Sequence, residues 1–434
     1  MPAARCCGPA RRSCSSGREM AERPYVARTR RLDRDVDLVA FAGGDGHLFE
    51  REGLGLAGRG ELLRIDVPPL DPAAAAAATS DAFDRFEVDD EVGSPGCGPV
   101  AFGAFPFDPA EPRTLVVPRV VVGRAEDGTR WITTTARRDE PAPDPSTVGL
   151  DLVPPAESEV DPGAIVVRAA RPAADWCAAL ADGRDRLRDG ELTKFVFARE
   201  VVVETERPLP RSAILRRLRA GYPSCYITSV GAMVGASPEL LLSRRGDVVR
   251  SRPMAGTAPR SPDPAVDARL AAGLLASSKD RHEHQIVIDM IHDALLPWCS
   301  YLDAEPEPSV LGMANVQHLA TYLEGRLSAP AASAVELVTA LHPTPAICGT
   351  PTDRALEVIR ELEGLERGAY AGPVGWLDAE GNGDWAVGIR SAELVGTRAR
   401  VFAGVGVVAD SDPEAELAET RSKLQAMLSA LLRP

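Results

Sequence analysis

Several stretches of the chain show the alternation of apolar and polar residues, or the enrichment in Val, Ile and Phe, that predicts β-strands. These stretches are residues 114–123, 131–136, 194–204, 226–243, 386–395 and 400–408. Strongly helical stretches lie among them, and several strands are joined by short connections. We therefore expect an α+β fold in which the strands pair largely antiparallel.

Three sites carry signals for the start of a helix. Asp71 and Pro72 supply a capping residue and a proline at the first helical position, ahead of six alanines. Residues 411–413, Ser-Asp-Pro, repeat this arrangement near the C-terminus. After Asp280, apolar residues recur with the spacing of one helical stripe. They are Ile286, Val287, Met290, Ile291, Ala294 and Leu295.

Glu283 lies on that apolar stripe, four residues before Val287 and seven before Met290. A helix that buries the stripe carries this carboxylate inward, where it needs a cation, a cluster of donors or a proton. Because Glu283 stands at the end of the stripe, a carboxylate that reaches solvent is the alternative.

Glu416, Glu419 and Lys423 fall within an arc of about 60° on the C-terminal helix. Taken alone, this is ordinary surface pairing. Carboxylates from two helices, however, are the hard oxygen ligands that suit magnesium, which keeps several waters and is completed by an anionic substrate. Zinc is disfavoured, because His282 and His284 point about 200° apart on a helix and cannot converge on one ion.

Composition restricts the class of protein. The chain has 434 residues, of which 44% are apolar, and this suffices for a large core with an interior site. Its formal charge of −14 has the wrong sign for binding a phosphate backbone, so we expect no nucleic-acid partner. No run approaches the roughly eighteen apolar residues that span a membrane, and we expect no membrane contact.

Five cysteines lack paired spacing, which indicates reduced thiols and a cytoplasmic location. They are Cys97, Cys177, Cys225, Cys299 and Cys348.

Two segments interrupt the patterned sequence. Residues 1–19 carry three cysteines and four arginines but no uninterrupted apolar run, so we expect a disordered arm rather than a secretory signal. Met20 is a candidate for the true start. Six prolines between residues 140 and 162 mark a long connection. The connection does not by itself establish two domains, and we expect residues 20–434 to form a single unit.

A series of short motifs runs from about residue 175 to the C-terminus. They are LTK at 192–194, ASPE at 236–239, RPMAGT at 252–257, KDRHEH at 279–284, VQHL at 316–319, LHPTPA at 341–346, YAGPVGW at 370–376, IRSA at 389–392, AGVG at 403–406 and ELAET at 416–420, followed by Lys423. Each is weak alone, but together and in this order they resemble the chorismate-binding enzyme family. The resemblance implies two packed, largely antiparallel sheets with helices outside. The part before the proline-rich connection matches less clearly.

The resemblance also implies the ligands of the site. In that family a magnesium ion holds the ring carboxylate of the substrate chorismate, and the matching ligands here are Glu283 and Glu419. Glu416 lies close by and binds either directly or through water. The expected cofactor is therefore Mg2+. This assignment agrees with the inward carboxylates that the helical spacing suggested.

Nine further residues are implied as substrate contacts. They are Gly256, Thr257 and Lys423 near the ring carboxylate, Tyr370 and Arg390 at the enolpyruvyl carboxylate, and His318, Ala346, Gly404 and Gly406 elsewhere in the pocket. A guanidinium suits a carboxylate because it binds with two parallel donors. Each assignment has a structural alternative. Arg390 could be an exposed cross-strand residue, and His318 could be a hydrogen-bonded core residue. Gly404 and Gly406 could mark a plain strand bulge.

Formation of isochorismate adds water at C2 of the ring while the C4 hydroxyl departs, so the reaction needs a base and an acid. The resemblance implies Lys194 as the base and Glu239 as the acid. Lys194 must be partly neutral for this, and Glu239 must be protonated when it donates. Without the resemblance, Lys194 would be a solvated strand residue and Glu239 a turn residue after Pro238.

Three positions distinguish members of the family. Ala255 stands where members that form a covalent intermediate have lysine. Ala346 and Thr352 stand where ammonia-using members and salicylate synthases have threonine and lysine. No Leu-Leu-Glu-Ser segment of a tryptophan-regulated member is present. Isochorismate formation is thus the expected activity, with salicylate formation as the runner-up and a non-catalytic chorismate-binding protein as a distant third. The sequence leaves open the menaquinone or siderophore pathway and the oligomeric state, and it is compatible with a monomer.

Overall fold

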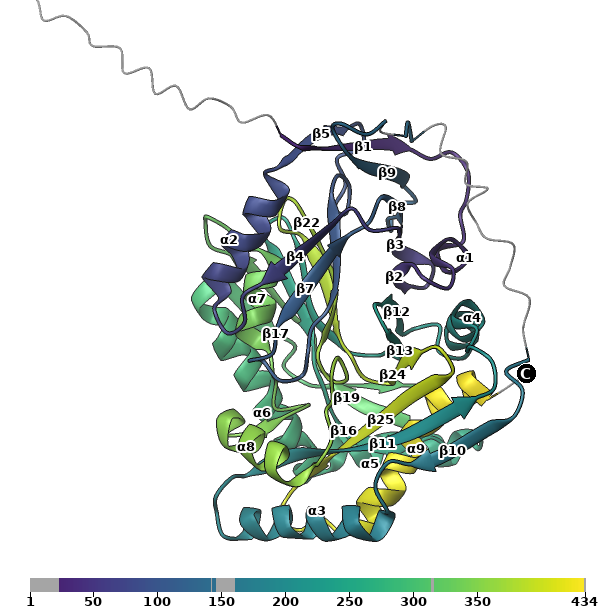
Figure 1. Cartoon of the computed structure of the whole chain (residues 1–434). Coiled ribbons are helices and arrows are strands. Elements are labelled where there is room, and N and C mark those ends of the chain that lie inside the picture. Colours follow the sequence, from purple (N-terminus) through teal and green to yellow (C-terminus); the bar gives the residue numbers. More distant parts are fainter. Residues whose placement is uncertain (1–22, 142, 146–160, 314–315, 433–434) are drawn as a thin grey trace, which may run out of the picture.

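Two large β-sheets pack face to face, and helices cover their outer sides (Figure 1). The computed structural model describes residues 23–141, 143–145, 161–313 and 316–432. The expected arm at 1–19 lies outside the described residues. The expected α+β architecture of packed antiparallel sheets with outer helices is confirmed.

The larger sheet contains thirteen strands. They are β1 (Tyr25–Arg31), β2 (His47–Arg51), β3 (Leu54–Arg59), β5 (Phe86–Asp90), β8 (Val120–Arg124), β9 (Arg130–Arg137), β10 (Ile165–Ala169), β11 (Lys194–Thr205), β12 (Tyr226–Val230), β13 (Met233–Ser237), β21 (Gly349–Thr350), β24 (Ser391–Val395) and β25 (Arg398–Val407). Their order is β10-β11-β25-β24-β13-β12-β2-β3-β8-β9-β1-β5, with β21 paired to β11.

The second sheet has nine strands, and a third has three. In spatial order the nine are β17 (Cys299–Ala304), β20 (Leu323–Leu327), β15 (Val248–Arg252), β14 (Leu240–Arg245), β23 (Gly383–Val387), β22 (Pro373–Asp378), β6 (Val100–Ala104), β7 (Arg113–Val117) and β4 (Leu63–Val67). The three are β16 (Met254–Pro259), β19 (Val316–Ala320) and β18 (Ser309–Gly312). The ladders are antiparallel except that β1 pairs parallel with β5.

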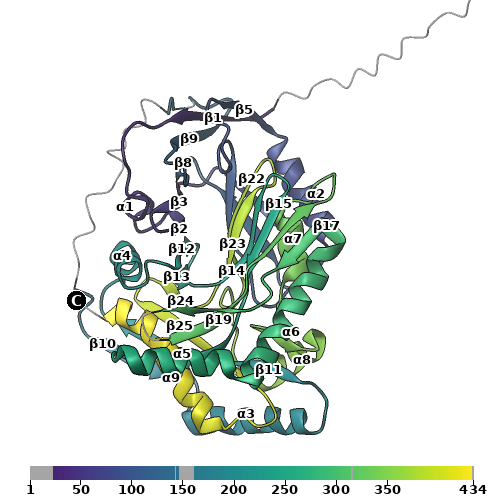
Figure 2. The ribbon, with the colours of Figure 1, turned by 180° about the vertical axis from the view of Figure 1, so that it is seen from behind.

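The helices lie mainly at the open ends and outer faces of the sheets (Figure 2). They are α1 (Leu38–Ala42), α2 (Pro72–Phe83), α3 (Ala173–Arg188), α4 (Arg211–Gly221), α5 (Pro264–Ala276), α6 (Ser278–Leu295), α7 (Ala334–Leu341), α8 (Thr352–Leu362) and α9 (Pro413–Leu432). None of these described helices is long and apolar enough to cross a membrane.

The three expected helix starts are confirmed. Asp71 caps α2 by accepting a hydrogen bond from the backbone N–H of Ala74 at 3.0 Å. The helix α6 buries Val287, Ile291 and Leu295 of the expected apolar stripe, and it also buries Ile288, which was not expected on it. The C-terminal helix α9 begins at Pro413 as expected and extends for 20 residues.

Three expected strand stretches are interrupted in the structure. Residues 114–123 form the end of β7 in one sheet and most of β8 in the other, because the chain crosses between the sheets at Pro118, which has no N–H for a ladder. Residues 226–243 form three strands rather than one continuous stretch. Residues 386–395 are divided by a bend at Arg390, whose φ is 51°.

Strands from before and after the proline-rich connection share both large sheets. Ile227 of β12 lies opposite Glu50 of β2 in one sheet, and Val374 of β22 lies opposite Ala104 of β6 in the other. Phe102 and Trp376 of one sheet pack with Phe49 of the other in a common apolar core. The site-bearing second half of the chain is therefore buried against the first.

Glu50 is a buried carboxylate within this framework. Its side chain is 1% exposed, and neither oxygen has a hydrogen-bond partner among the described residues. The nearest cation, Nη1 of Arg219, is 3.7 Å away and is bonded to Asp37 at 2.7 Å. Burial raises the pKa of Glu50 to about 7, although Arg219 opposes the shift.

Replacing Glu50 with Gln should stabilise the protein increasingly as pH rises. Ionisation of a carboxyl whose pKa moves from 4.5 to about 7 on folding opposes the folded state above pH 4.5, and an amide cannot ionise. We expect the stability gain of Glu50→Gln to be about 2–3 kcal/mol larger near pH 8 than near pH 5. Urea unfolding at both pH values measures it, and a pH-independent difference would contradict the account.

Candidate active site

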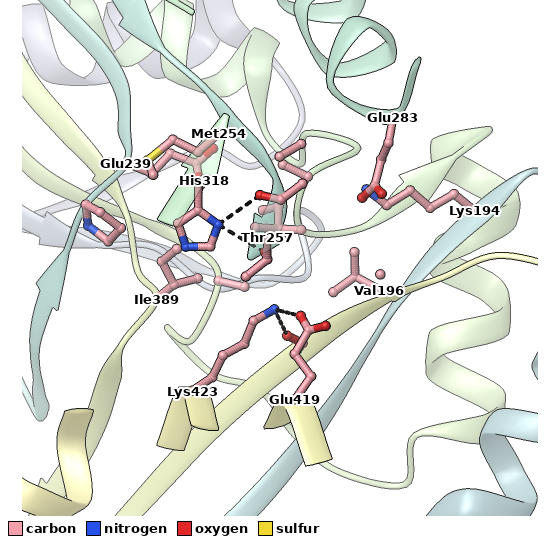
Figure 3. Close-up of a pocket in the computed structure, with 18 of the residues that line it drawn as sticks. Lys194, Val196, Glu239, Met254, Thr257, Glu283, His318, Ile389, Glu419 and Lys423 are labelled. Carbon is pink, nitrogen blue, oxygen red and sulfur yellow. Dashed lines mark hydrogen bonds and ion pairs between the residues drawn. The ribbon is translucent and has the colours of Figure 1, made fainter. Parts of the chain in front are cut away.

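One cavity of about 260 Å³ brings together all fourteen candidate site residues. It is lined by Lys194, Glu239, Gly256, Thr257, Glu283, His318, Ala346, Tyr370, Arg390, Gly404, Gly406, Glu416, Glu419 and Lys423. They come from β11, β16, β19, β25, α6 and α9 and from the connections that precede β14, β21, β22 and β24. Figure 3 labels several of them, among them Lys194, Glu239 and Glu283. The individual role of each residue stays a prediction.

A buried ion pair joins the first strand of the site to the helix α6. Nζ of Lys194 lies 2.6 Å from Oε1 of Glu283, and the two side chains are 5% and 23% exposed. Burial raises the pKa of Glu283, but Lys194, with help from Lys279 and Lys423, outweighs burial and lowers that pKa overall. The expected inward carboxylate is therefore present and ionised.

Gly404 and Gly406 of β25 leave the space that these side chains occupy. A Cβ at position 406 would stand 3.0 Å from Cε of Lys194 and 3.2 Å from Oε1 of Glu283. A Cβ at position 404 would stand 2.9 Å from the hydroxyl oxygen of Tyr370. The β11–β25 ladder runs in unbroken register through both glycines, so the alternative of a strand bulge does not apply.

The helix α9 supplies a second group of charges. Nζ of Lys423 lies 2.7 Å from Oε1 of Glu419 and donates to the carbonyl oxygen of Gly404 at 2.9 Å. Glu416 accepts a hydrogen bond from Oγ of Ser411 at 2.8 Å. Burial raises the pKa of Glu416. The helix thus turns two carboxylates and one ammonium toward the same cavity.

Glu239 lies in the turn between β13 and β14 and is 4% exposed. Burial raises its pKa to about 7, although a backbone hydrogen bond from Met254 and the charges of Lys194 and Arg390 oppose the shift. Figure 3 shows Glu239 and Lys194 on opposite sides of the cavity. One wall therefore carries an acid that holds its proton near neutral pH, and the other carries an amine.

His318 is a buried, hydrogen-bonded residue that also lines the cavity. Its Nδ1 lies 3.1 Å from the carbonyl oxygen of Gly256 and 3.0 Å from Oγ1 of Thr257, so Nδ1 carries the proton. Its Nε2 then accepts from Nη2 of Arg390 at 3.4 Å. Burial, followed by the charges of Arg390 and Lys423, lowers the pKa of His318 to about 3. The ring is neutral at physiological pH.

Arg390 is a cation of the cavity wall, not an exposed cross-strand residue. Within the described part of the chain its guanidinium has no carboxylate in ion-pair contact, and the one hydrogen bond of its side chain goes to His318. Tyr370 lines the same cavity, and burial raises its pKa to about 12, so its hydroxyl remains a donor. A half-buried guanidinium without a counter-ion favours the binding of an anion in the cavity.

Two charged residues of the cavity were not predicted as site residues. Lys279 and Asp280 line it from the first turn of α6. Lys279 stands four residues before Glu283, the spacing of neighbours on one helix face, so the sequence contained a signal for it. Thr352, in contrast, lines a neighbouring groove with Ile286 and not the cavity itself.

The carboxylates fit a magnesium site that a ligand completes. Glu283, Glu416 and Glu419 converge on the cavity from two helices, yet no described group of three acidic, His or Cys residues is close enough to hold an ion without further ligands. Such partial sets of hard oxygens suit Mg2+, which binds one or two carboxylates plus water and substrate. His282 is exposed whereas His284 is buried and bonded to Thr321 at 2.8 Å, as expected for residues on different faces of α6.

Comparison with known proteins matches residues 50–432 to the chorismate-binding enzyme family model. The chain belongs to the chorismate-binding enzyme family. Among relatives in this family, a Mycobacterium tuberculosis protein assigned as isochorismate synthase MenF is 42% identical over 351 residues, which cover 77% of this chain and 87% of the relative. Isochorismate synthase DhbC of Bacillus subtilis is 38% identical over 344 residues, covering 77% and 81%.

Solved structures of this family share the fold. A Bacillus anthracis structure assigned as the 2,3-dihydroxybenzoate-specific isochorismate synthase DhbC superposes with a TM-score of 0.76 at 32% identity, covering 91% of this chain and 98% of that one. The menaquinone-specific isochorismate synthase MenF of Escherichia coli gives 0.77 at 24% identity, covering 94% and 95%, a likeness of fold alone.

Removing one charge of the Lys194–Glu283 pair should destabilise this family member more than removing both. Glu283→Gln leaves the buried ammonium of Lys194 without its counter-ion, and we expect a loss of about 1–3 kcal/mol in the free energy of unfolding. Adding Lys194→Met should recover part of that loss. Chemical unfolding of both single variants and the double variant in magnesium-free buffer gives the coupling energy. Strictly additive losses would show that the pair is not formed in solution.

Proposed function

We propose that the chain is an isochorismate synthase, which converts chorismate to isochorismate in a magnesium-dependent reaction. The observation that carries the proposal is the pairing of Glu239 and Lys194 across one cavity whose wall also contains Arg390 without an anionic partner. The relatives named above bear this activity in their names. A dianionic substrate with a ring between its two carboxylates suits such a cavity.

The two carboxylates of chorismate have separate partners in this proposal. Arg390 and the protonated hydroxyl of Tyr370 bind the enolpyruvyl carboxylate, and His318 fixes the guanidinium by accepting its hydrogen bond. Lys423 and Thr257, with the backbone at Gly256, face the ring carboxylate. The methyl group of Ala346 leaves its part of the wall without a hydroxyl.

The charge balance of the cavity supports a divalent cation. Four cations (Lys194, Lys279, Lys423 and Arg390) face four carboxylates (Asp280, Glu283, Glu416 and Glu419), with Glu239 protonated. A dianionic substrate alone would leave an excess of buried negative charge, which a dication offsets. Glu283 and Glu419 would hold Mg2+, with Glu416 close enough to act directly or through water. The ion would neutralise and orient the ring carboxylate.

Lys194 and Glu239 divide the proton transfers between them. Nζ of Lys194 bonds Oε1 of Glu283, and to act as a base it would have to leave that oxygen, which binding of a metal by Glu283 would permit. In its neutral form Lys194 takes a proton from the water that adds to C2, the ring double bond shifts, and the C4 hydroxyl leaves as water with the proton of Glu239. A carboxyl with a pKa of about 7 is suited to this donation.

The remaining features of the proposal concern the whole chain. Relatives specific for menaquinone and for 2,3-dihydroxybenzoate both occur, and isochorismate would serve either pathway. A monomer suffices, because a single chain supplies every lining residue of the cavity. The free thiols of the described cysteines suit a cytoplasmic enzyme. The sheets shared by both halves of the chain suit a single unit over residues 20–434.

Incubation with chorismate and Mg2+ should yield a product of unchanged mass that separates from chorismate on chromatography and has the NMR spectrum of isochorismate. Loss of pyruvate would identify salicylate formation instead, and no consumption of chorismate would favour a non-catalytic binding protein.

We expect chelation of the metal to stop turnover, and Lys194→Ala to lower kcat by at least about a thousandfold without unfolding the protein. A near-normal rate for Lys194→Ala would remove this lysine from the mechanism.

The advantage of wild type over Glu239→Gln should shrink as pH rises above the pKa of Glu239. Both proteins need Lys194 in its neutral form, but only wild type also needs the proton on Glu239, whose pKa is raised to about 7. The ratio of the wild-type kcat/KM to that of Glu239→Gln should therefore fall by about tenfold per pH unit well above pH 7. Profiles of kcat/KM against pH for both proteins test the assignment, and a ratio that does not change with pH would refute it.

A further inference from the structure

A buried ion pair lies behind the cavity wall and has no part in the chemistry described so far. Nε and Nη2 of Arg367 donate to the two carboxylate oxygens of Glu363, each at 2.7 Å. The side chains are 3% and 2% exposed, and neither lines the cavity. Glu363 follows the last residue of α8, and Arg367 precedes Tyr370 by three residues.

The guanidinium of Arg367 also bonds two separate segments of the cavity wall. Nη2 donates to the carbonyl oxygen of Val196 in β11 at 2.7 Å, and Nη1 donates to that of Ile347, ahead of β21, at 3.1 Å. Val196 and Ile347 both line the cavity. Glu363 accepts a short hydrogen bond from the backbone N–H of Ala198, so the pair holds β11 at two points.

The segments held in this way carry residues of the proposed mechanism. Lys194 is two residues before Val196 on the same strand and therefore on the same face. Ala346 is next to Ile347 in the wall. The backbone N–H of Tyr370 donates to the carbonyl oxygen of Arg367 itself at 3.0 Å. One buried residue thus contacts three wall segments that are distant in the sequence.

The first half of the chain supports the guanidinium from its other side. The ring centroid of Phe107 lies 3.9 Å from Cζ of Arg367. Phe107 is fixed in turn, because its N–H donates to the carbonyl oxygen of Gly368 at 2.8 Å and its carbonyl oxygen lies 2.9 Å from Nε2 of His342. The planar group is held by stacking, by its ion pair and by two carbonyls, which fixes its orientation.

Stability alone is a weak explanation for such a pair. Desolvation of two charges offsets most of their attraction, and apolar side chains of similar volume often serve a core equally well. Fixed geometry is what an apolar replacement could not supply, because it would release the carbonyls of Val196 and Ile347. Small displacements of a reacting group are costly in rate.

We propose that Arg367, oriented by Glu363 and Phe107, is a positioning residue that sets the placement of Lys194 and of the wall at Ala346. This inference rests on the proposed function, because it assumes that Lys194 is the base. Arg367 touches no substrate and acts only through the backbone of β11 and of the segment before β21. It also makes the first half of the chain, through Phe107, a contributor to the geometry of the site.

The test compares Arg367→Lys with Arg113→Lys. A lysine at position 367 can keep the charge pair with Glu363, but its single nitrogen cannot also hold both carbonyls. Arg113 is a matched control: it is 2% exposed, lies 5.5 Å from the ring centroid of Phe105, and donates to the carbonyl oxygen of Pro109 and to Thr339, both at 3.1 Å. It does not line the cavity.

Circular dichroism and thermal melts give the folded fraction of each variant at the assay temperature, and kcat is expressed per folded chain. We expect Arg367→Lys to lower kcat by about 10- to 100-fold with KM within about threefold of wild type, and Arg113→Lys to lower only the melting temperature. Glu363→Gln keeps the bonds of Arg367 to the two carbonyls. It should lower the melting temperature and should lower kcat less than Arg367→Lys does.

Three results would overturn the proposal. They are a kcat of Arg367→Lys per folded chain equal to that of Arg113→Lys, a loss of kcat explained by the folded fraction, and a loss confined to KM. Wild-type protein is assayed in parallel for its product. If wild type makes no isochorismate, the proposed function fails, whereas an active wild type with an unaffected Arg367→Lys variant shows that only the positioning role is wrong.

Discussion

The ion pair between Lys194 and Glu283 holds two opposite charges 2.6 Å apart in the wall of the cavity. Neither charge could remain there alone, since an unpaired buried ion is far more costly than a paired one. Lys423 and Glu419 form a second such pair at 2.7 Å in the same wall, whereas Arg390 has no carboxylate in ion-pair contact among the described residues. In the proposed function, a dianionic substrate would enter such a site together with a compensating cation. The substrate, the metal and the release of Lys194 from Glu283 would then all follow from one charge balance.

The fold provides the close approach that this balance needs. The glycines at 404 and 406 remove the side chains that would separate β25 from Lys194, Glu283 and Tyr370. Helices α6 and α9 then bring carboxylates from opposite sides, and the buried guanidinium of Arg367 ties β11 to the segment before β21 from behind. Because both large sheets contain strands from both halves of the chain, a disturbance in either half can reach the site.

Helical periodicity alone indicated that Glu283 points inward and that Glu416, Glu419 and Lys423 share a face, because both depend on local geometry. Lys279 could have been found in the same way. The roles of Lys194 and Glu239 could not, since only the resemblance distinguishes them from a solvated lysine and a turn residue. The four-residue spacing to Glu363 was the one local signal for Arg367, and it could not reveal the bonds to backbone carbonyls that are distant in the sequence. The pattern of residues 114–123 predicted one strand. It did not reveal that the residues before and after Pro118 belong to different sheets.

The central claim is that the cavity adds a solvent water at C2 while the C4 hydroxyl departs, with Lys194 and Glu239 handling the protons. Turnover of chorismate in water enriched in the heavy oxygen isotope tests this directly, with the product analysed by mass spectrometry and carbon NMR. The account predicts one solvent-derived oxygen, located at C2 of isochorismate. A product that retains the original hydroxyl oxygen would mean that the hydroxyl moves within the substrate, and the assignment of Lys194 as the base that activates water would be contradicted.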